Sequence, residues 1–197
     1  MATVIANMSM SLDGFIAHPD DNVGELFEWY SAGPVTVDTA NDDVTAHTDE
    51  ASAEVFAEAI RSVGALVTGR RLFDLTNGWG GTHPVGSPVF VVTHSAPTDW
   101  PHPDAPFTFV TDGVASAIEQ AKAVAGDAIV AIASANITQQ ALELGLVDRI
   151  SVDLVPILLG DGIPFFANLA KTPVRLDDPT VVQGKRVTHL HYDVLKA

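Results

Sequence analysis

A continuous apolar run, Ala-Ile-Val-Ala-Ile-Ala at residues 128–133, constrains the fold of this chain more than any other stretch. A strand with one face in water alternates polar and apolar residues, so an unbroken run indicates a strand covered on both faces. Such strands belong to parallel sheets that carry helices on each side. Residues 65–68 read as a second buried strand, which favours a sheet of this kind.

Strand and helix patterns alternate along most of the 197 residues. Further strands are expected at 4–11, 89–93, 107–110 and 150–155, and helices are expected near 49 and 69 and over 114–124 and 137–144. The tail, 174–195, reads as two antiparallel strands joined around 183–185. This order predicts a single α/β domain over residues 1–197, in which a mostly parallel central sheet with antiparallel C-terminal edge strands forms a three-layer α/β/α arrangement.

Segment 18–48 separates the first strand from the first long helix and is rich in Asp, Asn, Gly and Pro. It contains an aromatic cluster, Leu-Phe-Glu-Trp-Tyr, at residues 26–30. Long irregular connections inside a compact domain usually form functional lids or are disordered. Because aromatic side chains favour packing, the sequence predicts a lid or loop here, with Trp29 and Tyr30 as candidate pocket walls.

The chain carries 25 acidic and 10 basic residues, a formal net charge of −15. This charge opposes binding to nucleic acid or to an anionic membrane surface, because both are themselves negative. The sequence has no cysteine, no apolar run long enough to span a bilayer and no basic and then apolar leader after Met1. We therefore expect a cytoplasmic protein that acts on a small molecule.

In a mostly parallel sheet, ligands bind beyond the carboxyl ends of the strands. The junctions at residues 11–14, 69–72, 93–95 and 133–137 fall there, and each contains small, hydroxylated or basic residues. Together they describe a surface able to hold an extended, phosphate-bearing dinucleotide. The candidate contacts are Gly69, Arg70, Arg71, Leu72, Thr93, His94, Ser95, Ala133, Ser134, Ala135, Asn136 and Ile137, of which Asn136 also fits as a helix N-cap.

Arg70 and Arg71 directly follow a buried strand and stand at the start of a short helix. A guanidinium binds phosphate through a fork of donors, and the free N–H groups of a helix start also favour an anion. Ordinary solvent-facing arginines would give the same pattern. Since the whole chain has only 10 basic residues, the pair favours an anion site.

Asp13 and Gly14 interrupt the apolar pattern at the end of the first strand. Two interpretations stay open, because Asp-Gly is a common turn pair and an acid on the same face as Asn7 and Ser11 would also lie in a ligand pocket. We favour the pocket. Ser11 and Asp13 would then contact the substrate, Gly14 would allow close backbone approach, and Phe15 would begin the pocket wall.

His189 and His191 are two residues apart on a strand and therefore share one face. A metal site would need a third ligand, and the sequence offers none at a convincing spacing. The solvent face of an edge strand is the favoured interpretation for both histidines. We therefore expect no metal ion.

Four blocks of the sequence, MSLDGFIA, GALVTGRRLFD, PVFVVTHS and ALELGLVDRISVDLVPILLGDGIPFF, resemble the dihydrofolate reductase-like superfamily. More specifically, they are similar to the C-terminal reductase domain of bifunctional riboflavin-biosynthesis deaminase/reductase enzymes, over residues 3 to about 195. The resemblance implies a dihydrofolate reductase-like fold with NADPH as hydride donor. It places residues 69–72 at the adenosine phosphate, 93–95 near the adenine-side ribose phosphate and 133–137 at the pyrophosphate.

On this resemblance, Arg70 and Arg71 are expected to recognise the 2′-phosphate of NADPH and so to select NADPH over NADH. The family usually has Gly-Gly where this chain has Ala133-Ser134, and glycines let the backbone approach phosphate closely. The zinc deaminase that accompanies the reductase in bifunctional enzymes needs paired cysteines, and this chain has none.

The sequence thus predicts an NADPH-dependent oxidoreductase resembling 5-amino-6-(5-phosphoribosylamino)uracil reductase, which transfers hydride to a carbonyl or imine carbon of a small substrate. Asp13 or an ordered water would supply the proton, and Trp79 is a further candidate pocket residue. The alternative is a non-catalytic module that binds a nucleotide or pterin-like ligand on the same fold. The apolar residues of segment 174–194 and the resemblance also predict a homodimer.

Overall fold

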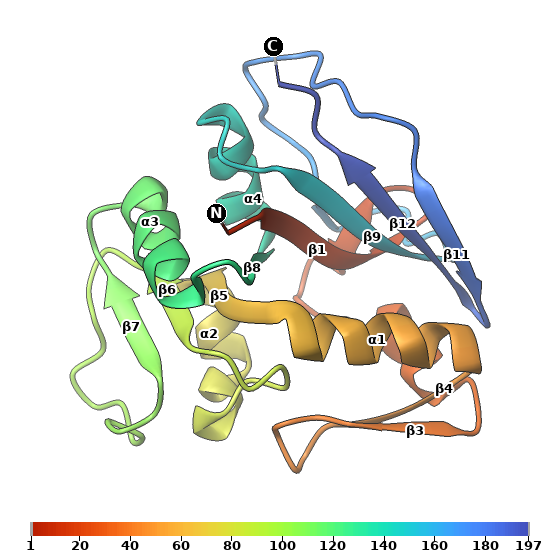
Figure 1. Cartoon of the computed structure of the whole chain (residues 1–197), viewed down its shortest axis with the longest axis horizontal. Helices are drawn as coiled ribbons and strands as arrows, with labels where there is room; N and C mark the ends of the chain where they lie inside the picture. Colours follow the sequence, from red (N-terminus) through yellow and green to blue (C-terminus); the bar gives the residue numbers. More distant parts are fainter. Residues whose placement is uncertain (1, 197) are drawn as a thin grey trace.

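The computed structural model describes residues 2–196, and its centre is an eight-stranded sheet with the order β11-β12-β9-β1-β8-β5-β6-β7 (Figure 1). The strands from β9 to β7 in this order are parallel, and β12 and β11 continue the sheet in antiparallel fashion. The expected mostly parallel sheet with antiparallel C-terminal strands is confirmed. Its strands are β1 (Val4–Ser11), β5 (Val63–Gly69), β6 (Val89–Val92), β7 (Phe107–Val110), β8 (Ile129–Ala133), β9 (Arg149–Val155), β11 (Thr180–Gly184) and β12 (Val187–Asp193).

Helices cover both faces of this sheet, with α1 and α2 on one side and α3 and α4 on the other (Figure 1). On β8, Val130 and Ile132 pack in the core with α3 and α4, whereas Ala131 and Ala133 pack in the cluster around Phe73 of α2. The apolar run is therefore covered on both faces, as the sequence predicts. Among residues 2–196, no helix is long and apolar enough to cross a membrane. The helices are α1 (Glu50–Ser62), α2 (Arg70–Leu75), α3 (Val114–Ala125) and α4 (Ala135–Glu143).

The start of α1 is set by Asp49, whose Oδ1 accepts hydrogen bonds from the backbone N–H groups of Ala51 (3.1 Å) and Ser52 (3.3 Å). These amides have no partner inside the helix, and a carboxylate also interacts favourably with the N-terminal end of the helix dipole. The sequence favours a cap at residue 48 or 49, and the structure assigns this role to Asp49.

Segment 18–48 contains regular structure over much of its length. It includes a 3-10 helix, η1 (Gly24–Ser31), and a hairpin of β3 (Val35–Asp38) and β4 (Thr45–Thr48) that packs on α1. Trp29 of η1 is buried, and its Nε1 donates a hydrogen bond to Ser9 Oγ of β1 at 3.2 Å. The aromatic cluster of this segment therefore covers the sheet, and a lid function for the segment stays a prediction.

β12 lies inside the sheet, between β9 and β11, so the interpretation of His189 as a residue on the solvent face of an edge strand is wrong. His189 is fully buried under α1, and its Nε2 lies 3.0 Å from Ser52 Oγ. His191 is half-buried and hydrogen-bonds Ser151 Oγ at 2.8 Å. Local alternation could not reveal this burial, because the covering helix lies more than a hundred residues earlier in the chain.

Candidate functional site

The carboxyl ends of β5 and β8 lie side by side and bring two of the predicted junctions together. Thr68 pairs with Ala133 in the sheet register, and Thr68 Oγ1 donates a hydrogen bond to Ala133 O at 2.9 Å. One residue further on, a Cβ atom added to Gly69 would lie only 3.1 Å from Ser134 Oγ. Glycine at 69 therefore leaves room for the serine hydroxyl between the two strand ends.

Arg70 connects the neighbouring ends of β5 and β8 with the end of β6. Its Nε donates to Asp74 Oδ1 at 2.7 Å, and its Nη1 donates to the backbone oxygen of Ser95 at 3.0 Å. Thr93 Oγ1 donates to the same oxygen at 2.9 Å, while the side chain of His94 is exposed. Arg70 and residues 93–95 thus form one surface, and its binding of a cofactor phosphate stays a prediction.

Arg71 contacts a different segment from Arg70. Its guanidinium forms a forked ion pair with Asp21, in which Nε lies 2.9 Å from Oδ1 and Nη2 lies 2.7 Å from Oδ2. Leu72, the next residue, is half-buried. The two arginines, expected to share one phosphate, therefore contact separate partners, and no pattern in the sequence indicates Asp21 as one of them.

The start of α4 presents its backbone to the same edge of the sheet. Ser134 precedes the helix and its side chain makes no capping hydrogen bond, while Ala135 and Ile137 are buried in the core. The expected N-cap at Asn136 is wrong, because this residue lies inside the first turn and its Oδ1 accepts from Gln140 Nε2 at 2.6 Å. The Ser134 hydroxyl and the first backbone N–H groups of α4, which have no partner inside the helix, could meet a ligand here.

Asp13 closes a turn and also holds a distant loop. Its Oδ1 accepts from Ser11 Oγ at 2.6 Å, and Oδ2 accepts from the backbone N–H of Gly160 at 2.7 Å. The N–H of Leu159 adds a third hydrogen bond at 3.2 Å. The Ser11 hydrogen bond, together with those from the two amides, lowers the pKa of Asp13. The carboxylate is therefore ionised near neutral pH and is a poor source of the proton that the sequence analysis assigned to it or to water.

Two further predicted pocket residues take their positions from the same turn. Gly14 has a φ of +94°, a backbone conformation that favours glycine. Phe15 begins β2 (Phe15–Ala17), which pairs with β10 (Ile163–Pro164), and its N–H donates to Ser11 Oγ at 3.0 Å. The SLDG block and the ILLGDG block of the sequence, which are 146 residues apart at Asp13 and Leu159, thus meet in space.

Trp79 lies away from this turn. It belongs to η2 (Asn77–Gly81), where Asn77 and the following residues adopt left-handed φ angles, and Asn41 Nδ2 donates to its backbone oxygen at 2.9 Å. Its ring contacts His83 and packs towards Phe107 of β7. Because β7 is four strands from β1 in the sheet, the structure does not bring Trp79 to Asp13, and its role as a pocket wall stays a prediction.

Asn7 leads into a buried polar chain that the sequence analysis missed. Its Nδ2 lies 3.3 Å from Asp153 Oδ2, and Asp153 Oδ1 lies 2.7 Å from His189 Nδ1. The chain continues through His189 Nε2 to Ser52 Oγ, which lies 2.8 Å from Asp49 Oδ2. A lone acid inside the strand ISVDLV is the one sequence signal that could have indicated this chain.

The hydrogen-bond donors and acceptors along this chain define how Ser52 contacts His189. Burial acts to raise the pKa of Asp49, but hydrogen bonds from Lys185, Ser52 and Ala51 outweigh it and lower the pKa. Asp49 is therefore ionised and takes the only hydroxyl proton of Ser52. Ser52 must then accept from His189 Nε2, while Nδ1 faces the Asp153 carboxyl group at 2.7 Å. Both ring nitrogens of His189 thus have a polar partner inside the protein, Asp153 on one side and Ser52 on the other.

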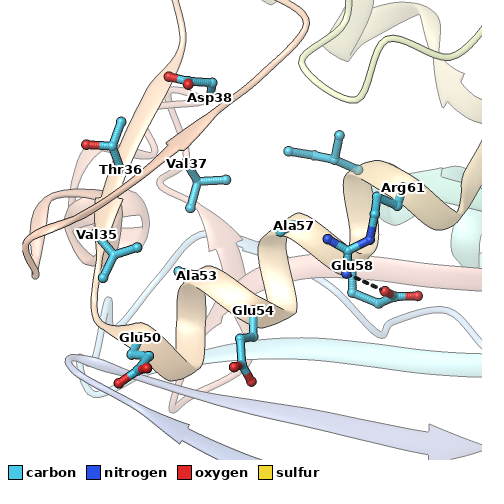
Figure 2. Close-up of a pocket in the computed structure, with 11 residues that line it drawn as sticks. Val35, Thr36, Val37, Asp38, Glu50, Ala53, Glu54, Ala57, Glu58 and Arg61 are labelled. Atoms are coloured by element: carbon cyan, nitrogen blue, oxygen red, sulfur yellow. Dashed lines mark hydrogen bonds and ion pairs between the residues drawn. The ribbon is translucent and has the colours of Figure 1, made fainter.

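A groove between the β3–β4 hairpin and α1, of about 800 Å³, contains none of the predicted site residues. Figure 2 shows that Glu50, Glu54 and Glu58 follow one another along its helical side. Arg61, the basic residue of the lining, pairs with Glu58 at 2.7 Å. So acidic a groove does not suit a phosphate-bearing nucleotide. Among residues 2–196, no three His, Asp or Glu side chains are grouped to hold a metal ion.

Known structures share this fold. A putative riboflavin biosynthesis protein from Shewanella sp. PV-4 superposes with a TM-score of 0.74 at 24% identity, covering 100% of both chains. The deaminase/5-amino-6-(5-phosphoribosylamino)uracil reductase of Thermotoga maritima gives 0.64 at 13% identity, over 98% of this chain and 57% of that one. Dihydrofolate reductase from Enterococcus faecalis, described as complexed with NADP(H), gives 0.57 at 15% identity, over 98% and 97% of the two chains.

These identities are low enough that the likeness shows the fold alone. None of the curated proteins compared with the chain matches it. The model of the RibD C-terminal domain, in contrast, matches residues 2–190, which is nearly the whole chain. The chain therefore belongs to the RibD C-terminal domain family, and its fold is like that of dihydrofolate reductase.

Proposed function

We propose that the chain is an NADPH-dependent reductase that transfers hydride to a carbonyl or imine carbon of a small phosphorylated substrate, as in the reduction of 5-amino-6-(5-phosphoribosylamino)uracil. The observation that carries this proposal is the convergence of Gly69, Arg70 and Ser134 with the end of β6 at one edge of the sheet. Membership of the RibD C-terminal domain family supports a reductase. A related fold described with NADP(H) supports a nicotinamide cofactor.

The residues present fit such a cofactor. Arg70 uses Nε and Nη1 for protein contacts, which leaves the Nη2 donors of its guanidinium for a phosphate on the ribose. The Ser134 hydroxyl and the backbone amides that begin α4 would meet the pyrophosphate, because amides at a helix start bind anions. The cofactor would supply the hydride, and the protein would position both reactants.

The chain's own groups would orient the substrate at the carboxyl end of β1. Ionised Asp13 fixes the amides of Leu159 and Gly160 and, through Ser11, the turn into β2. It would present a negative edge to substrate donors. Because the carboxylate is already deprotonated, the proton that completes the reduction would come from water.

Fluorescence titration of NADPH into the protein tests the proposal most directly. Saturable binding at micromolar to millimolar cofactor is expected, followed by NADPH consumption with a ribosylamino-pyrimidine substrate. An Asp13→Asn variant keeps the shape of the turn and should lose turnover more than cofactor binding. Absence of binding at millimolar NADPH would refute the proposal.

A second candidate is a module that binds a nucleotide or pterin-like ligand without turnover. One observation favours it: Ser134 fills space next to Gly69 where relatives of this kind usually have glycine. An added side chain there keeps a pyrophosphate further from the backbone. Cofactor binding without oxidation across ribosylamino-pyrimidine, dihydrofolate and simple carbonyl substrates would support this candidate, and steady NADPH consumption would exclude it.

A further inference from the structure

Arg71 already holds an anion that belongs to the protein. Asp21 meets its guanidinium edge to edge through the pairs Nε–Oδ1 and Nη2–Oδ2, at 2.9 and 2.7 Å. This forked geometry is the one that an arginine offers to a phosphate group. Asp21 lies 50 residues earlier in the chain, so the contact results from the fold and is not forced by neighbouring residues of one helix.

The carboxylate is held in place by its own turn. Asp21 has a φ of +69°, its N–H donates to His18 O at 3.0 Å, and the N–H of His18 donates to Asn22 O at 2.8 Å. The Asp21 side chain is only 15% exposed, whereas that of Arg71 is 68% exposed. The acid is therefore fixed from the protein side, while the guanidinium remains open to an incoming ligand.

We propose that Asp21 is a built-in competitor for the nucleotide phosphate that would bind Arg71, and that it sets the cofactor affinity of this site. A phosphate must either displace the carboxylate from Nε and Nη2 or bind the remaining donors beside a negative charge. Both routes weaken binding, so removal of the charge at residue 21 strengthens it. That the phosphate belongs to a nucleotide rests on the proposed function. The competition between Asp21 and a phosphate for Arg71 does not.

Asp21→Asn is the sharp test, because asparagine has the same shape and tolerates a positive φ. Asp20→Asn is the matched control. It removes one charge from the same loop, where Asp20 Oδ1 accepts only the Asn22 N–H among the hydrogen bonds described. Calorimetric titrations of both variants and the wild type would use NADPH, NADH and inorganic pyrophosphate, after circular dichroism has shown equal folding.

Asp21→Asn should bind NADPH about two- to fivefold more tightly than the wild type, the range expected for loss of one exposed ion pair. Asp20→Asn should change the NADPH affinity by a factor less than about half as large as the factor for Asp21→Asn. A parallel gain for NADH assigns the pyrophosphate to Arg71, and a gain for NADPH alone assigns the ribose phosphate. Either result supports the competition.

Inorganic pyrophosphate separates this inference from the proposed function. If NADPH fails to bind but pyrophosphate still binds Asp21→Asn more tightly than Asp20→Asn, the reductase proposal fails and the competition stands. In the wild type, pyrophosphate should also shift the Nε–H NMR signal of Arg71, assigned by its loss in Arg71→Lys. Unchanged or weaker phosphate binding by Asp21→Asn, or no binding of any of the three ligands, would overturn the inference.

Discussion

Replacing His189 with leucine removes the imidazole at the centre of the buried polar chain while keeping a side chain of similar bulk. The Asp153 carboxylate, whose side chain is 13% exposed, then loses the partner at 2.7 Å and keeps only the weaker Asn7 contact at 3.3 Å. Ser52 loses its contact with the ring at 3.0 Å. The variant therefore leaves Asp153 and Ser52 with one hydrogen-bond partner fewer each.

The expected loss follows from these contacts. A hydrogen bond to a charged group contributes about 1.5–3 kcal/mol and a neutral one about 1 kcal/mol. The sum, about 2.5–4 kcal/mol, is the expected loss in the free energy of unfolding. For a chain of this size, each kcal/mol lowers the melting temperature by about 2–4 °C, so a decrease of roughly 5–16 °C is expected.

Urea denaturation followed by circular dichroism would measure the loss, with His191→Leu as control. His191 lies on the same strand, and burial, as the largest effect, lowers its pKa, so it is a neutral ring whose loss should cost only about 1 kcal/mol. In the double variant, His189→Leu with Asp153→Leu, the loss in the free energy of unfolding should be smaller than the sum of the two single losses by at least about 2 kcal/mol. Additive losses, or equal losses for His189 and His191, would refute an energetic coupling between His189 and Asp153.

Three further predictions concern the cofactor, pH and assembly. Arg70→Ala should weaken NADPH binding at least about tenfold and leave NADH nearly unchanged, and equal losses in titrations of the two would place Arg70 away from the ribose phosphate. Burial lowers the pKa of His83 from 6.5 to about 4. Between these two pH values, the folded state therefore binds fewer protons than the unfolded state. Stability should therefore fall by up to about 3 kcal/mol from pH 6.5 to pH 4, and denaturation of His83→Asn should lack this fall. An apolar groove lined in part by Leu12, Phe166 and Leu176 favours a homodimer. Light scattering should therefore give about twice 20.8 kDa. A stable monomer would show that these residues only complete the chain's own core.

The parts of the fold that the sequence predicted are those set by nearby residues. β8 was recognisable because coverage on both faces removes polar residues from the strand itself, and this is visible within six letters. Asp49 was recognisable as a cap because the amides it satisfies lie two and three residues away. The meeting of junctions 69–72 and 133–137 at one edge of the sheet also followed from the parallel order of the strands, which places their carboxyl ends together.

The parts that it missed depend on contacts between distant segments. His189 is buried by a helix 137 residues earlier, and the backbone at Trp79 is held by an amide 38 residues earlier. Asp13 was understood as a pocket acid or a turn residue, and the structure shows that it hydrogen-bonds within its turn and to a loop 146 residues later. Alternation within one strand carries no information about such partners.

The central place of β1 in the sheet has a consequence for synthesis on the ribosome. Among the strands of this sheet β1 is made first, yet both of its neighbours, β8 and β9, are made only after residue 128. Roughly 120 residues separate the end of β1 from the start of β8, which is roughly 6–24 s of translation at about 5–20 residues per second. During that time β1 has no sheet partner, so chaperones would protect the nascent chain most effectively at β1.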